Sequence, residues 1–145
     1  MKYDILVVGS GPGGYVAAIR AAQLGKRVGL VERAEAGGVC LNWGCIPTKA
    51  LLKSAQIYAH CKAAEQYGVE IAGEVRPVLD KMVARSRGVA ETMNKGVLFL
   101  LKKNNIDLIT GFGRLTAPGH VDVDGTDYEA DHIVLATGAR PREMP

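Results

Sequence analysis

The stretch that decides the fold is Ile5-Leu6-Val7-Val8-Gly9-Ser10-Gly11-Pro12-Gly13-Gly14. Its first four residues form a continuous apolar run, which is typical of a strand buried on both faces of a parallel sheet. The glycines that follow form the pattern G-x-G-x-x-G. An Ala-rich segment over residues 15–24 is predicted to be a helix that ends before Gly25. A strand, a glycine loop and a helix in this order predict the nucleotide-binding turn of a Rossmann-type α/β fold.

Each glycine of the pattern has a physical role. Gly9 permits the tight turn, Gly11 lets the backbone approach a pyrophosphate, and Gly14 lets helix and strand pack closely. The pyrophosphate would lie at the helix N-terminus, where free N–H groups and the helix dipole favour anions. A second strand over residues 28–31 leads to Glu32, where a carboxylate can accept hydrogen bonds from ribose hydroxyls and disfavours a 2′-phosphate. These residues predict a site for FAD or NAD and do not choose between them; a glycine turn that binds nothing is the alternative.

The remaining sequence predicts two helices followed by short strands. One helix is expected from near Pro47 to about Tyr67, and another from Pro77 to about Lys103. Apolar positions of the second helix recur at spacings of three and four, which predicts a packing face: Leu79, Met82, Val83, Ser86, Val89, Met93, Val97 and Leu100. Strands are expected over residues 106–110, 113–116, 120–123, 128–131 and 133–136, with a hairpin turn at Asp124-Gly125. The fold class is therefore α/β, a parallel sheet with helices and a small added antiparallel β element.

Composition bounds the function classes. The chain has 145 residues, 48% of them apolar and 23% charged, with a net charge of +3, as in one globular domain. Lys and Arg are scattered, so no nucleic-acid partner is expected, and no apolar run reaches the roughly 20 residues of a membrane helix. The start Met1-Lys2-Tyr3-Asp4 resembles no signal peptide, so a cytoplasmic protein is expected. In that compartment a close cysteine pair is more often catalytic or metal-binding than structural.

The second informative stretch is Gly37-Gly38-Val39-Cys40-Leu41-Asn42-Trp43-Gly44-Cys45-Ile46-Pro47-Thr48-Lys49. On an ideal helix the Cα atoms of Cys40 and Cys45 would be more than about 8 Å apart. A disulfide needs a Cα separation nearer roughly 4.4–6.8 Å, so a bridge requires a distorted turn. Asn42 and Gly44 tolerate such a turn. Both sulfurs would also lie near the N-terminus of the helix expected from Pro47, where the dipole lowers the pKa of a thiol.

Three interpretations of this cysteine pair remain open, and a redox-active disulfide is favoured. A zinc site lacks two further ligands at metal-binding spacing, so no metal is expected. Two inert buried cysteines fit poorly among so many glycines. The third cysteine, Cys61, is expected to be a small buried residue, and the three histidines carry no motif.

Together, the glycine loop, Glu32 and the C-x-x-x-x-C segment resemble the flavin-dependent pyridine nucleotide–disulfide oxidoreductases. The strand and turn over residues 133–139 are similar to the segment with which that family returns to the flavin. Within the family, residues 15–25 and 45–52 are most similar to the branch that oxidises dihydrolipoamide. Trp43 and Thr48 depart from the residues commonly found there, and glutathione and mercuric reductases share the cysteine spacing. They are therefore the alternative, together with a stand-alone nucleotide-binding redox module.

The resemblance implies a role for each matching residue. Gly9, Gly11, Gly14 and Glu32 would hold the ADP half of FAD. Cys40 would be the thiol that exchanges with substrate, and Cys45 the thiol that passes electrons to the flavin. Further contacts to FAD are expected from residues spread along the chain: Lys49 and Thr137 and Gly138 near the flavin, and Gly113 on the adenosine side.

The resemblance also implies partners and a larger protein. The substrate would be dihydrolipoamide on a lipoyl carrier domain, with NAD as the final acceptor. The parent enzyme would be a homodimer that serves 2-oxo acid dehydrogenase or glycine cleavage complexes. Members of the family are about three times as long, so residues 1–145 are expected to be the N-terminal segment of a discontinuous FAD-binding domain, inactive without the NAD and dimerisation domains.

Overall fold

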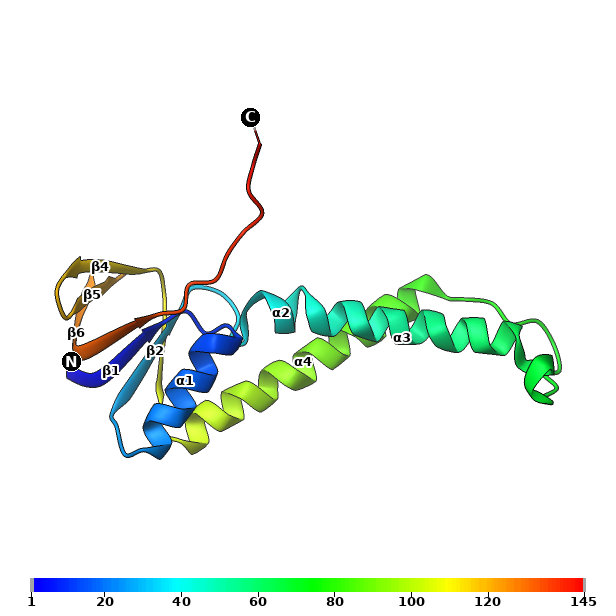
Figure 1. The fold of residues 1–145 in the computed structure, drawn as a ribbon, viewed down its shortest axis with the longest axis horizontal. Helices are drawn as coiled ribbons and strands as arrows, with labels where there is room; N and C mark the ends of the chain where they lie inside the picture. Colours follow the sequence, from blue (N-terminus) through cyan, green and yellow to red (C-terminus); the bar gives the residue numbers. More distant parts are fainter. Residues whose placement is uncertain (1, 145) are drawn as a thin grey trace.

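The computed structural model describes residues 2–144, and it has a sheet at one end and a long helical arm at the other (Figure 1). The sheet has six strands in the order β3-β2-β1-β6-β5-β4. The strands are β1 Lys2–Val8, β2 Val28–Glu32, β3 Asp107–Thr110, β4 Gly113–Ala117, β5 His120–Val123 and β6 Thr126–Leu135. The expected mixed α/β architecture is confirmed.

The parallel half of the sheet comprises β3, β2, β1 and β6. Val7 of β1 is in register with Leu30 of β2 on one side and with Val134 of β6 on the other. Helix α1, Pro12–Gln23, joins β1 to β2 and buries Ala18 and Ala21 against this half. The apolar run that predicted a buried strand is thus the centre of the sheet, since Leu6 and Val7 are fully buried.

The antiparallel half is a meander of β4, β5 and β6. Its predicted turn is confirmed, because Asp124 and Gly125 both have positive φ, at 49° and 88°. The prediction of two strands over 128–131 and 133–136 was wrong, because β6 runs unbroken from Thr126 to Leu135. His132 does not interrupt it, because this residue pairs in register with Ile5 of β1.

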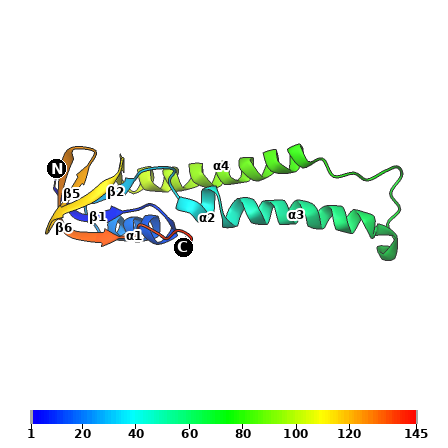
Figure 2. The ribbon, with the colours of Figure 1, turned by 90° about the horizontal axis from the view of Figure 1, so that it is seen from above.

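The arm consists of two long antiparallel helices that leave the sheet and return to it (Figures 1 and 2). Its elements are α2 Gly38–Asn42, α3 Cys45–Lys62, the 3-10 helix η1 Ala64–Tyr67 and α4 Leu79–Lys103. Helix α3 begins two residues before Pro47, whose missing N–H is harmless in the first turn. It ends at Lys62 rather than at Tyr67, because the chain tightens there into η1.

The packing face predicted for α4 is only partly buried, so this prediction was wrong for several of its positions. Ser86 and Val97 are buried, whereas Leu79 at the tip is 69% exposed and Met93 is 46% exposed. Only the inner end of α4 reaches the sheet, where Val97 and Leu101 join the core cluster under α1. Within residues 2–144, no helix is both long and apolar enough to cross a membrane.

Candidate functional site

The glycine loop lies between the carboxyl end of β1 and the start of α1, and its three glycines meet different surroundings. A Cβ at Gly9, where φ is +101°, would strike the carbonyl of Ala136 after β6. A Cβ at Gly14 would overlap the carbonyl of Gly9. A Cβ at Gly11 would meet nothing within 4 Å. Gly9 and Gly14 are therefore required by the fold itself, whereas Gly11 leaves open space at the N-terminus of α1, where an anion is favoured.

Glu32 ends β2 beside this loop. One of its carboxylate oxygens accepts hydrogen bonds from the backbone N–H of Ser10 at 2.9 Å and from the Ser10 hydroxyl at 2.7 Å. The other accepts one from the N–H of Ala34 at 2.9 Å. Burial would raise the pKa of Glu32, but these hydrogen bonds outweigh it and hold the pKa below its ordinary value. Glu32 is therefore a carboxylate near neutral pH, and three donors fix its position.

The segment that carries the cysteines packs directly on the glycine loop. The N–H of Gly37 donates to the carbonyl of Ser10 at 3.0 Å. Gly38 has a φ of +65°, and a Cβ there would lie 2.7 Å from the Cα of Gly11. Because the backbones touch at Gly38 and Gly11, the first turn of α2 forms one wall of the proposed nucleotide site.

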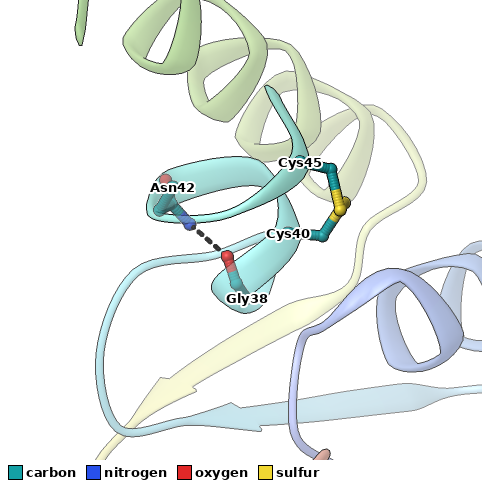
Figure 3. Close-up of a disulfide and its surroundings, with 4 residues drawn as sticks. All are labelled: Gly38, Cys40, Asn42 and Cys45. Carbon is teal, nitrogen blue, oxygen red and sulfur yellow. Dashed lines mark hydrogen bonds between the residues drawn. A yellow bond between two sulfur atoms is a disulfide. The ribbon is translucent and has the colours of Figure 1, made fainter. Parts of the chain in front are cut away.

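A disulfide joins Cys40 and Cys45, with their Cα atoms 4.6 Å apart (Figure 3). Cys40 lies in α2, and Cys45 is the first residue of α3. The chain breaks between the two helices at Gly44, where a Cβ would be 2.9 Å from the carbonyl of Val39. The distorted turn expected between the cysteines is confirmed, and it takes the form of two separate helices.

The disulfide is accessible to a reacting thiol. Cys45 is exposed and Cys40 is half-buried. Asn42 lies on the other side of α2 from the disulfide (Figure 3), and it lines a shallow hollow with Trp43 and Arg87. That hollow does not open on the sulfurs. Cys45 lies at the N-terminus of an 18-residue helix, where the dipole favours a thiolate over a thiol.

The other four predicted site residues do not all lie beside the glycine loop. Thr137 follows β6, and its Cα would be 3.1 Å from a Cβ at Gly9, so the chain returns to the glycine loop. Gly113 begins β4, and a Cβ there would touch Val8 and Val31 at the ends of β1 and β2. Lys49 lies exposed on the first turns of α3, and Gly138 is exposed in the C-terminal tail. No hydrogen bond or ion pair in the described part of the chain joins Lys49 or Gly138 to the glycine loop.

Cys61 lies far out on α3 and is half-buried, not buried as expected. Within residues 2–144, no group of three or more His, Cys, Asp or Glu side chains is placed to hold a metal ion.

The polar side chains that fix this site were not predicted from the sequence. Ser10 is fully buried and links Glu32 to Gly37. Asn42 is 8% exposed and is bonded to Asn94 of α4. Neither Ser10 nor Asn94 carries a sequence signal, because each works through contacts made far along the chain.

Comparison with known proteins gives the class first. The family model described as pyridine nucleotide-disulphide oxidoreductase matches residues 3–145, and the chain belongs to this family.

Three similar curated relatives then narrow the comparison, and all three are dihydrolipoyl dehydrogenases. That of Zymomonas mobilis subsp. mobilis is 51% identical over 150 residues, which cover 99% of this chain and 32% of the relative. That of Rhizobium etli is 48% identical over 164 residues, 99% of this chain and 34% of the relative. That of Thermus scotoductus is 49% identical over 144 residues, 98% of this chain and 30% of the relative. The chain thus spans about a third of the length of the curated relatives it matches.

Proposed function

We propose that this chain is the FAD-binding, disulfide-bearing part of a dihydrolipoyl dehydrogenase, which oxidises dihydrolipoamide and reduces NAD. The observation that carries the proposal is the accessible Cys40–Cys45 disulfide, held against a dinucleotide-type glycine loop. The family match and the names of the relatives support the same function. A glutathione or mercuric reductase is the second candidate, and only the shared cysteine spacing favours it.

The residues present fit FAD. The space beside Gly11 suits a pyrophosphate, and the ionised Glu32 suits ribose hydroxyls. FAD, when bound, supplies an acceptor for the two electrons that leave the dithiol, and NAD takes them up in turn. Lys49, Gly113, Thr137 and Gly138 complete the proposed contacts, and the approach of Thr137 to Gly9 supports its inclusion.

The cysteines perform thiol–disulfide exchange. A thiolate of dihydrolipoamide attacks the sulfur of Cys40, and the bond to Cys45 breaks. The second substrate thiol then attacks the mixed disulfide and releases Cys40. The substrate loses two electrons and two protons as its disulfide closes, and the cysteines gain them. Cys45 is the better residue to hold negative charge after the first step, since it lies at the N-terminus of α3.

The proposal extends to the whole protein. Residues 1–145 are the N-terminal segment of a discontinuous FAD-binding domain in a homodimer. Its substrate group is presented by a lipoyl carrier domain of a 2-oxo acid dehydrogenase or glycine cleavage complex. A cytoplasmic location fits a cysteine pair that works by reversible thiol–disulfide exchange rather than as a structural disulfide.

The test measures NADH formed from dihydrolipoamide and NAD by the purified natural-length protein. Cys40→Ser and Cys45→Ser are each expected to reduce turnover to background, because each removes one half of the exchanging pair. Cys61→Ser is the matched control and is expected to keep full activity, since Cys61 lies in the arm away from the disulfide. Oxidation of NADH or NADPH by glutathione disulfide, with no NADH formed from dihydrolipoamide, would support the second candidate.

A further inference from the structure

Helix α4 holds both halves of the disulfide segment through polar side chains. Arg87 and Asn94 are two turns apart on one face of α4, with the buried Ala90 between them. Arg87 donates to the backbone carbonyl of Asn42 at 3.1 Å. Asn94 donates to the carbonyl of Ala36 at 2.7 Å and to the side-chain oxygen of Asn42 at 3.3 Å.

The side chain of Asn42, which lies within the disulfide segment, makes further hydrogen bonds of this kind. The hydrogen bonds of Asn42, Arg87 and Asn94 are together called the brace. The side-chain amide of Asn42 donates to the carbonyl of Ala36 at 2.9 Å. It also donates to the carbonyl of Gly38 at 3.0 Å (Figure 3). Because Ala36 precedes α2 and Asn42 ends it, these bonds fix both ends of the short helix that carries Cys40. A five-residue helix is too short to be stable by itself, so it depends on such outside contacts.

The helix that carries Cys45 is fixed to the same support. Arg85 of α4 donates to the carbonyl of Ala50 at 2.8 Å and to the hydroxyl of Ser54 at 3.4 Å, both on α3. One rigid helix of 25 residues therefore holds the elements on both sides of the disulfide. Helix α4 thus contacts both of the helices that carry the cysteines, although it lies remote from them in sequence.

We propose that Asn94 and Arg87 are positioning residues for the cysteine pair, which hold Cys40 next to Cys45 and thereby set how readily the disulfide is reduced. The inference rests on the proposed function only in taking this disulfide as the reversible one. A brace that keeps two thiols close raises their effective concentration and favours the closed disulfide. Loosening it shifts the equilibrium with any reference dithiol toward the open form.

The test is the equilibrium of the natural-length protein with reduced and oxidised dithiothreitol under anaerobic conditions. Dithiothreitol closes its own ring as it gives two electrons and two protons to the disulfide. The fraction reduced is read by alkylation and mass analysis of the peptide that carries residues 40 and 45.

Asn94→Asp keeps the shape of the side chain but replaces the donor with a carboxylate that faces two acceptor oxygens. We expect it to shift the exchange constant about tenfold toward the dithiol, which for a two-electron couple is about 30 mV. Arg87→Gln, which leaves the Asn94 bonds intact, is expected to shift it in the same direction by about threefold, or about 14 mV. Thr92→Asp is the matched control, since it adds the same charge to an exposed position of α4 and should leave the constant unchanged.

Unchanged constants in both variants, with a lower melting temperature in Asn94→Asp alone, would overturn the proposal and leave the brace a structural one. If Asn94→Asp does not fold, Arg87→Gln decides the matter, and no shift there overturns the proposal. A wild-type disulfide that dithiothreitol does not open would instead count against the proposed function.

Discussion

The two ends of this molecule are built in different ways. At the sheet end, the largest fully buried side chains pack around the strands, among them Tyr3, Leu6 and Leu30. In the arm, α3 buries only Pro47 and Ala50 over 18 residues. Two of its large apolar side chains are mostly or about half exposed, Leu52 at 62% and Ile57 at 49%. The sheet end is thus stabilised by apolar burial, and the outer arm has little of it.

The cysteine pair lies at the junction between the sheet end and the arm, and contacts from both ends hold it in place. Gly38 packs on the glycine loop of the sheet end, backbone against backbone. Arg85, Arg87 and Asn94 of the arm hold the same segment by hydrogen bonds. The apolar core places the glycine loop, whereas polar contacts from α4 hold the disulfide segment beside it.

The largest expected effect compares the two ends of α4. Leu101 is 2% exposed and belongs to the core cluster, so Leu101→Ala should lower the free energy of unfolding by about 2–5 kcal/mol. Leu79 at the tip is 69% exposed, so Leu79→Ala should change it by less than about 0.5 kcal/mol. Urea unfolding followed by circular dichroism measures both. Equal losses would mean that the arm is packed as tightly as the sheet.

The next comparison is between neighbouring glycines at the start of α1. Gly14→Ala places a methyl group against the Gly9 carbonyl and should cost about 1–3 kcal/mol of stability or more. Gly13→Ala meets nothing within 4 Å and should stabilise the helix by up to about 1 kcal/mol. Thermal melting of the two variants side by side tests this. A stable Gly14→Ala protein would show that α1 is free to move away from β1.

A substitution at Gly11 should weaken the binding of FAD without changing the stability of the fold. Gly11→Ala meets no protein atom, so unfolding should change by less than about 0.5 kcal/mol. The methyl group would occupy the space proposed for the pyrophosphate, so FAD should bind at least about tenfold more weakly, which is about 1.4 kcal/mol. Fluorescence titration of the deflavinated natural-length protein gives the affinity. Unaltered binding would place the nucleotide elsewhere.

The smallest effect concerns Tyr3 at the sheet end. Burial, together with the charge and hydrogen bond of Asp107, raises the pKa of Tyr3 to about 12. In the unfolded chain the Tyr3 phenol ionises near pH 10. The stability that the neutral phenol contributes is therefore complete below pH 10 and is lost as the pH rises toward 12.

Tyr3→Phe should remove that pH dependence and cost about 1 kcal/mol at neutral pH. Urea midpoints at pH 8, 10 and 11 in both proteins measure it. A parallel decline in the two would assign the alkaline loss to another group.

Local patterns in the sequence predicted the sheet end well. The apolar run before Gly9 and the glycine spacing predicted β1, the loop and α1, because burial and backbone freedom are local requirements there. The turn at Asp124-Gly125 predicted the hairpin for the same reason. The expected bend between Cys40 and Cys45 followed from the disulfide distance, although the separate helix α2 did not.

The arm was predicted less well, because its properties depend on what lies beside it. Spacing alone indicated an apolar face on α4, but Leu79 and Met93 are 69% and 46% exposed, because spacing does not determine which positions of the face meet a neighbouring element. The partners of Asn42 could not be predicted either, since Asn94 is brought to it only by the return of α4 to the sheet. A polar side chain carries no periodic signal of its contacts.

The measurement that tests the role of the disulfide most directly is an anaerobic titration of the natural-length protein with dihydrolipoamide, with thiols counted and mapped at each step. We expect two new thiols to appear, at Cys40 and Cys45, while Cys61 reacts equally before and after reduction. Reduction that leaves Cys40 and Cys45 joined, or that yields no new thiol at these positions, would contradict the proposed function.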